Sequence, residues 1–201
     1  MTFRRTYLDH NATTPLRPEA RAAMLAALGV AGNPSSVHAE GRRARALVED
    51  AREQVAAAVN AKPAEVVFTA GATEANNWVL AGDWDTMIVS ALEHDSVLGP
   101  ARRCKTARVR PIPARYDGRI DLDRLAAELG PKPSRALLCV QMANNETGAI
   151  QDIEAIAQMA RASGFALHTD AVQALGKIAV DFKTLGSDTI SLSAHKIGGP
   201  K

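Results

Sequence analysis

The chain has 201 residues, 46% of them hydrophobic and 23% charged, and its formal net charge is +2 at pH 7. This composition is typical of a soluble globular protein, and no apolar stretch is long enough to span a bilayer. Lysine and arginine are spread along the chain without a block of like charge, which argues against a nucleic-acid-binding surface. The N-terminus lacks the apolar core of a secretory signal, so we expect a cytoplasmic protein.

The first part of the chain predicts two helices and then the first strands. Residues 17–28 are rich in alanine and leucine at helical spacing, and residues 37–59 repeat apolar positions at three and four. The β-branched and aromatic run EVVFT at 65–69 predicts a strand. A helix over 71–82 and a strand over 86–90 are expected to follow it.

The rest of the chain continues this alternation. Helices are predicted at 96–104, 121–129 and 152–164, strands at 107–113, 135–142, 165–171 and 189–194, and a turn at 114–120. Asp121 is expected to begin one of these helices and Gly164 to end another. Strands that alternate with helices and carry nearly continuous apolar sequence predict an α/β protein with a mainly parallel sheet flanked by helices.

Polar and small residues follow the predicted strands, at the edge where such sheets bind ligands. The segment TAGATEANN leads from a strand through Gly71 and Thr73 into a helix, whose N-terminal N–H groups suit a phosphate. The alternative is a plain turn with Thr73 as the cap. The segment is not a P-loop, because the lysine-bearing end of that motif is absent.

The segment HTDAVQ places Asp170 at the end of an apolar strand, where a carboxylate needs a partner. A protonated ring nitrogen is one such partner, and Gln173 could offer its amide to an oxygen of the same ligand. The alternative is that Asp170 caps a short turn toward Gln173. In EHDS, His94 either lies on a ring or shuttles protons, or is structural. In ANNETG, the adjacent amides Asn144 and Asn145 either bind a ligand or hold a turn.

The segment SAHK places Lys196 beside Ser193 and His195. A lysine in a pocket loses hydration, which lowers its pKa below about 10.4 and makes it a nucleophile for carbonyls. The alternative is a surface lysine, which we favour for Lys201. A phosphate cradle, a carboxylate for a ring nitrogen, an imidazole and a Schiff-base lysine are together the set that pyridoxal phosphate requires. No Ser-His-Asp or metal arrangement fits as well.

Seven segments of the chain together resemble the successive motifs of the cysteine desulfurases, which are class V aminotransferases. They are, in order, YLDHNATTP, GNPSSVH, FTAGATEANN, EHDSV, NNETGAIQDI, HTDAVQALGK and SLSAHKIGGPK. The resemblance implies the large domain of a fold-type I pyridoxal-phosphate enzyme, with an N-terminal arm at 1–15 and the cofactor-binding domain at 16–201. The implied reaction converts L-cysteine to L-alanine and leaves a persulfide on an enzyme cysteine.

The resemblance also implies a role for each candidate residue. Lys196 would carry the cofactor as the internal aldimine and move protons, Asp170 would face the pyridine nitrogen, and His94 would stack on the ring. Further cofactor contacts are implied for Gln173 and Asn145 at the ring hydroxyl, and for Ala72, Thr73, Ser193 and His195 at the phosphate. Asn11, Ala12 and Thr13 are implied near the substrate.

The chain ends just after Lys196, whereas the family continues for about as many residues again, so we interpret it as a fragment or truncated product. The absent part would carry the sulfur-accepting cysteine, which neither cysteine here can replace. Cys104 lies in a basic, helix-like segment and Cys139 in an apolar strand, and they lack metal-type spacing. We therefore expect reduced structural thiols, no metal site, and no desulfuration by this chain alone.

Two alternatives stay open at this point. One is a selenocysteine lyase or another class V enzyme, and the other is a non-catalytic binding module left by truncation. If the protein is a cysteine desulfurase, we expect a homodimer when it is full length, no direct contact with nucleic acid or membrane, and a sulfur-acceptor partner. That acceptor would belong to iron–sulfur cluster assembly or to tRNA thiolation.

Overall fold

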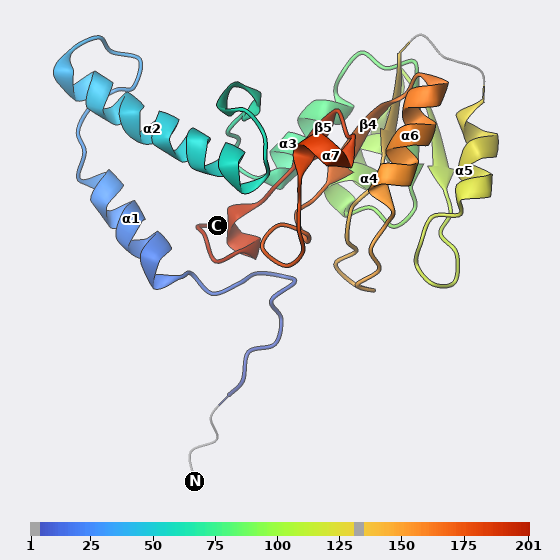
Figure 1. Cartoon of the computed structure of the whole chain (residues 1–201), viewed down its shortest axis with the longest axis horizontal. Helices are drawn as coiled ribbons and strands as arrows, with labels where there is room; N and C mark the ends of the chain where they lie inside the picture. The colour runs from blue at the N-terminus through green and yellow to red at the C-terminus, as the bar shows by residue number, and fades with distance from the viewer. Residues whose placement is uncertain (1–4, 131–134) are drawn as a thin grey trace. The chain divides into compact units, whose positions relative to one another are not determined.

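The computed structural model describes residues 5–130 and 135–201, and it divides the chain into two compact units. One unit comprises the residues up to Val67 together with Ser193–Lys201, and the other is Phe68–Leu192. Figure 1 labels helices α1 to α7 and strands β4 and β5. Of the N-terminal arm predicted at 1–15, residues 1–4 lie outside the described residues, and the boundary after residue 15 stays a prediction.

The unit Phe68–Leu192 is built on a parallel β-sheet. Its strands within the described residues are β1 (Thr86–Ser90), β2 (Arg108–Ile112), β3 (Ala136–Cys139), β4 (Ala166–Asp170) and β5 (Thr189–Ser191). They pair in the order β2-β1-β3-β4-β5, and each of these pairs is parallel. The predicted α/β architecture with a mainly parallel sheet is therefore confirmed.

Helices cover both faces of this sheet. They are α3 (Ala72–Leu80), α4 (Asp95–Arg103), α5 (Leu122–Leu129), α6 (Ile153–Ser163) and α7 (Phe182–Leu185). Ile88 and Leu138 pack in one core cluster with residues of α5 and α6, whereas Met87 and Leu137 pack in another with residues of α3 and α4. Burial on both faces explains why the central strands are almost continuously apolar.

The predicted helix ends are confirmed in two places. The Asp121 carboxylate accepts hydrogen bonds at 3.0 and 3.2 Å from first-turn N–H groups of α5. Gly164 ends α6 in the left-handed conformation at φ 75°, which favours glycine because it has no Cβ. These local signals fix where α5 starts and where α6 stops.

The other unit contains two helices and two short 3₁₀ turns among its described residues. They are α1 (Pro18–Leu28), α2 (Ala39–Ala58), η1 (Pro63–Glu65) and η2 (Ala194–Lys196). The predicted helices at 17–28 and 37–59 are confirmed. No residue of α1 is buried, so its helical state rests on the high intrinsic propensity of alanine and leucine rather than on packing.

The strand predicted at 65–69 is wrong. Glu65 ends the turn η1, and residues 66–69 form no strand, with Val67 and Phe68 exposed. An extended segment becomes a strand only when a neighbour takes its hydrogen bonds, and none of β1 to β5 pairs with this one. The strands predicted at 135–142 and 189–194 also end earlier, at Cys139 and Ser191.

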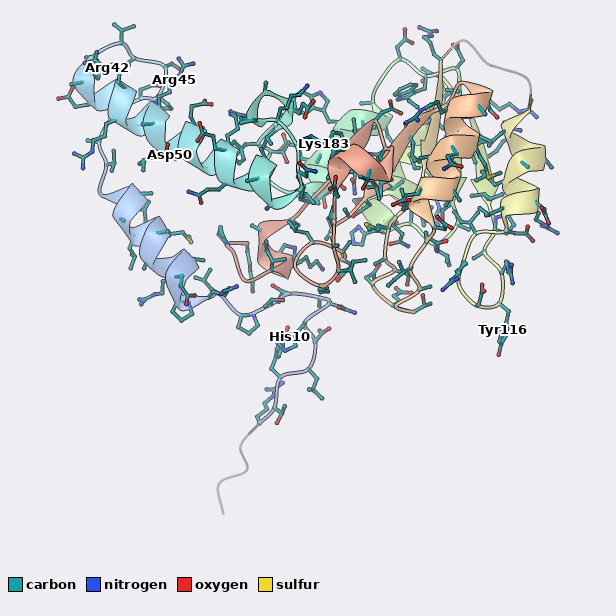
Figure 2. The ribbon with its side chains drawn as sticks, in the orientation of Figure 1. His10, Arg42, Arg45, Asp50, Tyr116 and Lys183 are labelled. Atoms are coloured by element: carbon teal, nitrogen blue, oxygen red, sulfur yellow. The ribbon has the colours of Figure 1, made fainter. Side chains whose placement is uncertain are left out.

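The turn predicted at 114–120 is confirmed. The Arg115 N–H donates to the Arg119 carbonyl oxygen at 2.7 Å, and Gly118 adopts a positive φ of 76°. Tyr116 stands at the tip of the turn and points away from the fold (Figure 2). The turn connects β2 to α5, and its last residue, Ile120, is buried in the core.

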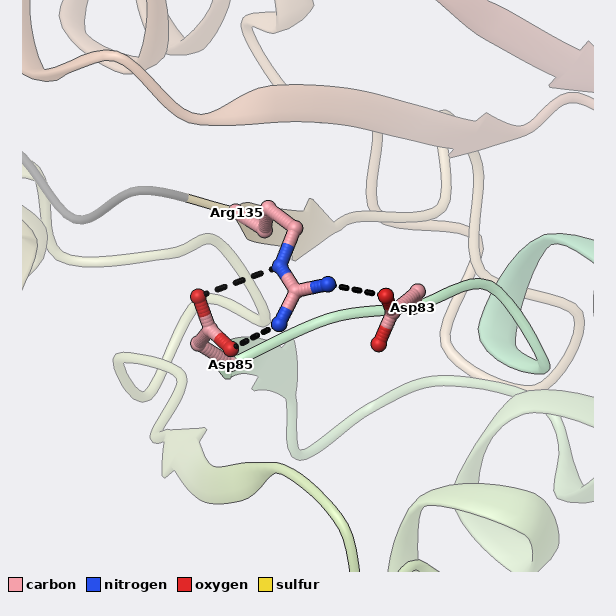
Figure 3. Close-up of polar contacts among 3 residues, drawn as sticks. All are labelled: Asp83, Asp85 and Arg135. Atoms are coloured by element: carbon pink, nitrogen blue, oxygen red, sulfur yellow. Dashed lines mark hydrogen bonds and ion pairs between the residues drawn. The ribbon is translucent and has the colours of Figure 1, made fainter.

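Arg135 joins the amino-terminal ends of β1 and β3. Its guanidinium donates to both oxygens of Asp85, at 2.6 and 3.3 Å, and to Asp83 (Figure 3). The Asp85 N–H donates in turn to the Arg135 carbonyl oxygen at 2.8 Å. These contacts strengthen the β1–β3 register at the edge of the sheet opposite to the one where polar residues gather.

Candidate functional site

Asp170 is the last residue of β4, and its side chain is fixed at the carboxyl end of the sheet. One carboxylate oxygen accepts from the Val172 N–H at 2.9 Å, and the other accepts from Asn76 Nδ2 at 2.9 Å. Asp170 is only 6% exposed. The hydrogen bond from Val172 matches the alternative in which Asp170 caps a turn. It uses only one carboxylate oxygen, and further lone pairs remain on the carboxylate.

Asn76, which sequence reasoning missed, lies at the centre of this group. It is fully buried on α3, and its amide nitrogen also donates to Ser96 Oγ at 2.9 Å. Its amide oxygen is 3.0 Å from His168 Nε2. The signal that could have indicated it is the quoted segment TAGATEANN, in which an amide follows the helix start by one turn.

His168 was also missed. It is fully buried in β4, two residues before Asp170 and therefore on the same face of the strand. Its Nδ1 lies 2.8 Å from Thr189 Oγ1 on β5. Burial removes hydration from the charged ring and lowers the pKa of His168 to about 4.

His94 immediately precedes α4 and caps it. Its Nδ1 accepts from the Ser96 N–H at 3.1 Å and lies 2.8 Å from Ser96 Oγ. This capping contact corresponds to the alternative in which His94 has a structural role. The stacking role implied by the family resemblance stays a prediction, because one ring nitrogen in a cap leaves the ring face available for another contact.

The start of α3 has Gly71 as its N-cap, and no side chain within the described residues caps it. Ala72 and Thr73 are the first two residues of the helix, so the alternative in which Thr73 is the cap is wrong. The first N–H groups of a helix lack intrahelical partners and suit an anion. Ala72 and Thr73 are therefore placed where the sequence analysis expected a phosphate.

The two adjacent amides after β3 have different surroundings. Asn144 Oδ1 accepts from the N–H groups of Glu146 and Thr147 at 2.9 and 2.7 Å, so Asn144 holds the turn. Asn145 is half-buried in the same turn. The sequence alternative of a structural amide therefore applies to Asn144, and ligand contact by Asn145 stays a prediction.

Gln173 is buried in the turn that follows β4. Its side-chain oxygen accepts from Lys177 Nζ, four residues further along the chain. Partial burial lowers the pKa of Lys177 below its usual value. Because the oxygen faces a lysine, the NH₂ group of Gln173 is the part of the amide suited to an acceptor such as a ring hydroxyl oxygen.

Glu93 is a second buried carboxyl that the sequence analysis did not select. One oxygen accepts from the Gln141 N–H at 2.6 Å, and the other has no hydrogen-bond partner within residues 5–130 and 135–201. Burial, assisted by the nearby charge of Asp170, raises the pKa of Glu93 to about 8. Glu93 is therefore held mainly as the neutral acid at pH 7.

Lys196 belongs to the other unit, where it lies against the N-terminal segment. Its Nζ donates to the carbonyl oxygens of Asn11 at 2.5 Å and Ala12 at 2.9 Å. Lys196 thus contacts the predicted substrate segment, although it lies 185 positions from Asn11 and 184 positions from Ala12 in the sequence. Two backbone oxygens hold the amine in one place.

The residues next to Lys196 make similar contacts. His195 Nδ1 is 3.2 Å from Thr13 Oγ1, and the Thr14 N–H donates to the His195 carbonyl oxygen at 2.9 Å. Partial burial, followed by the charges of Lys196 and Lys201, lowers the pKa of His195. Ser193 lies in extended backbone immediately before η2.

Of the two cysteines, Cys139 is the β3 residue paired with His168 of β4. Cys139 is fully buried in β3, and burial raises the pKa of its thiol well above the usual value. Cys104 follows α4 at the end opposite to His94, about 14 Å along the helix axis. A hydrogen bond with Thr106 lowers the pKa of the Cys104 thiol.

The described residues lack two kinds of site. No helix within residues 5–130 and 135–201 is both long and apolar enough to cross a membrane. The same residues contain no group of three or more histidine, cysteine, aspartate or glutamate side chains placed to hold a metal ion. The candidate residues are therefore those of the Asp170 and Lys196 groups.

Comparison with known proteins identifies similar sequences along almost all of the chain. The family model described as Aminotransferase class-V matches residues 6–201. A cysteine desulfurase of Frankia sp. (strain EuIK1) is 41% identical over 97% of this chain and 50% of its own length. A selenocysteine lyase of Bos taurus is 34% identical over 98% of this chain and 54% of its own length.

Solved structures agree with the sequence comparisons. A NifS-like protein from Rickettsia africae ESF-5 superposes with a TM-score of 0.91 at 34% identity, covering 97% of this chain and 55% of that chain. A structure described as SspA in complex with cysteine gives a TM-score of 0.91 at 30% identity, covering 98% and 59%. The chain thus spans about half the length of the curated relatives it matches.

Proposed function

This chain belongs to the class-V aminotransferase family, and we propose that it is the cofactor-binding part of a cysteine desulfurase. The reaction would take L-cysteine and an enzyme thiol to L-alanine and an enzyme persulfide. The C–S bond of the substrate breaks, an S–S bond forms on the enzyme, and a hydrogen replaces sulfur on the substrate carbon. The family resemblance predicted from the sequence is confirmed, and relatives of this kind depend on pyridoxal phosphate.

The residues present fit that cofactor. Asp170 offers to a cationic ring nitrogen a buried carboxylate that accepts hydrogen bonds from two neutral donors. The N-terminus of α3 suits a phosphate, and Gln173 presents an NH₂ group. When bound, the cofactor supplies an electron sink that weakens the bonds at the substrate Cα. The Asp170 carboxylate is the single observation that carries the proposal, because no cation within residues 5–130 and 135–201 forms an ion pair with it.

The chain's own residues would act as binding and proton-holding groups. Lys196 would hold the cofactor covalently through Nζ and move a proton at the substrate Cα. Asp170 would hold the proton on the ring nitrogen through its carboxylate. Thr73, Ser193 and His195 would bind the phosphate, and Asn145 would join Gln173 at the ring hydroxyl. Asn11, Ala12 and Thr13 would line the substrate side.

We assign the sulfur-accepting thiol to neither cysteine of this chain. Cys139 is enclosed in β3, and Cys104 is separated from His94 by the length of α4. A sulfur acceptor must approach the substrate sulfur as a thiolate. We therefore propose that residues 1–201 alone do not desulfurate cysteine, and that the activity belongs to a protein as long as the relatives.

The test of cofactor attachment is borohydride reduction of the protein with pyridoxal phosphate, followed by peptide mass mapping. The cofactor mass is expected on the peptide that holds Lys196. Lys196→Ala should abolish the label, whereas Lys177→Ala, Lys183→Ala and Lys201→Ala should retain it. A label on one of those three lysines in the wild-type protein would contradict the assignment. A protein that takes up no cofactor would favour the alternative of a non-catalytic binding module.

A selenocysteine lyase is the second candidate, because the Bos taurus relative has that name and matches 98% of this chain. Alanine release from L-cysteine and from L-selenocysteine, compared at equal concentrations, separates the two. We further propose a cytoplasmic homodimer that passes sulfur to an acceptor of iron–sulfur assembly or tRNA thiolation. Sedimentation and sulfur transfer to each acceptor class test these points.

A further inference from the structure

The amide of Asn76 has all its hydrogen-bonding groups in use, in a fully buried position. Its two N–H bonds point to Asp170 Oδ2 and Ser96 Oγ, both at 2.9 Å, and its oxygen meets His168 Nε2 at 3.0 Å. A buried amide costs free energy unless it is satisfied, so three partners make this an ordered arrangement. None of them belongs to α3 itself, so the contacts do nothing to form the helix.

The direction of each hydrogen bond follows from the chemistry of Asp170. A carboxylate only accepts, so the NH₂ end of Asn76 must face it, and a flipped amide would set two acceptors against each other. The amide oxygen therefore faces His168, which must carry its proton on Nε2. His168 Nδ1 then accepts from the Thr189 hydroxyl. The low pKa of His168, about 4, agrees with a neutral ring of one fixed tautomer.

The same amide also reaches His94. Ser96 Oγ accepts from Asn76, so its own hydrogen is available for His94 Nδ1 at 2.8 Å. That nitrogen also accepts from the Ser96 N–H. His94 consequently carries its ring proton on Nε2, away from the helix cap. One buried amide thus orients both Asp170 and His94.

Asp170 is held without a cation. Each of its oxygens takes one hydrogen bond from a neutral donor, and within residues 5–130 and 135–201 no lysine, arginine or protonated histidine forms an ion pair with it. A lysine in place of Asn76 would neutralise the carboxylate. Neutral donors fix its orientation and leave its charge for a cationic ligand.

We propose that Asn76 is a positioning residue, which sets the Asp170 carboxylate and the His94 ring in the orientations that meet the cofactor ring. The inference rests on the proposed function for the identity of that ring. It goes beyond that function by making ring-nitrogen protonation depend on Asn76, whose amide bonds to Asp170, Ser96 and His168.

The test uses Asn76→Leu and Asn76→Ala in the full chain, with Asn77→Ala as the matched control. Asn77 is the next residue of α3, and its amide donates to the backbone oxygens of Thr73 and Ser96 rather than to Asp170. Nitrogen-15 NMR reports the tautomers of His168 and His94 without cofactor. In the wild type both rings are expected with the proton on Nε2. Proton occupancy on Nδ1 of either ring in the wild type would overturn the network.

With ¹⁵N-labelled pyridoxal phosphate bound, the ring-nitrogen shift reports its protonation. Loss of a hydrogen bond to a charged group should make this nitrogen about tenfold easier to deprotonate in both Asn76 variants, with no change in Asn77→Ala. An unchanged ring-nitrogen shift in a folded Asn76 variant would overturn the inference. Failure of the wild type to take up cofactor would instead refute the proposed function, while the tautomers would still test the network. If Asn76→Leu does not fold, the ring-nitrogen shift of Asn76→Ala and the histidine tautomers of the wild type test the proposal.

Discussion

Lys196 donates through Nζ to the Ala12 carbonyl oxygen at 2.9 Å, across 184 positions of sequence. Together with the bond to Asn11, this contact ties the lysine turn to the N-terminal segment. Lys196→Ala should remove both bonds and loosen residues 11–14, because backbone carbonyls alone do not order a segment. Hydrogen exchange is expected to be faster at the Thr14 amide, and Lys201→Ala, a change at an exposed lysine, should leave it unaltered.

Asp170→Asn should keep the shape of the side chain but remove its charge. A hydrogen bond to a charged group contributes about 1.5–3 kcal/mol, so Cα-proton exchange of a bound amino acid should slow by roughly one to two orders of magnitude. Cofactor affinity should change much less. Exchange at the wild-type rate in the variant would remove Asp170 from the proposed mechanism.

Burial of His168 makes the free energy of unfolding depend on pH. Its pKa falls from 6.5 in the unfolded chain to about 4 in the fold, so between these values the unfolded state binds more protons. Stability is therefore fully present above pH 6.5 and is lost as the pH falls toward 4, by about 3 kcal/mol. Urea unfolding of His168→Gln should show a correspondingly smaller acid loss than the wild type between pH 7 and 4.

Glu93 gives the free energy of unfolding the opposite dependence on pH. Its pKa rises from 4.5 to about 8 on folding, so the folded state holds a proton that the unfolded state releases. The contribution of Glu93 to the free energy of unfolding is present below pH 4.5 and is lost as the pH rises through 8, by roughly 5 kcal/mol at most. Glu93→Gln keeps an oxygen for the Gln141 N–H and cannot ionise. Its stability should exceed that of the wild type at pH 9, and equal alkaline losses in both proteins would contradict the prediction.

Gly198→Ala should disturb the turn that carries Lys196. Gly198 has φ 85°, and an added Cβ would meet Arg17 Cγ at 2.4 Å. The backbone strain alone costs about 1 kcal/mol or more, which thermal unfolding would register. Combining it with Arg17→Ala separates the causes, because that change relieves the side-chain overlap and leaves the strain. Full recovery in the double variant would exclude a backbone contribution.

Sequence patterns predicted the parallel sheet because its strands are buried on both faces and because residues such as Asp121 mark the start of a connecting helix. They failed at 65–69, where β-propensity is high but no strand within the described residues pairs with the segment. They placed Asp170 correctly at the end of β4, since a carboxylate after an apolar strand stands out. They could not select Asn76 or His168, because the partners of a buried amide or imidazole depend on how α3 packs against β4 and β5.

The parallel sheet also governs the order in which the molecule can assemble. No neighbouring strands in it are joined by a tight hairpin, so each pairing must close a loop that contains a helix. The entropy of loop closure opposes every such step, and folding should take milliseconds or longer. The Asn76–Asp170 contact spans 94 positions, so we expect α3 to gain protection after β1 and β3 in pulse-labelled hydrogen exchange. The group that orients the carboxylate would then be among the last parts to form and the first to open under denaturant.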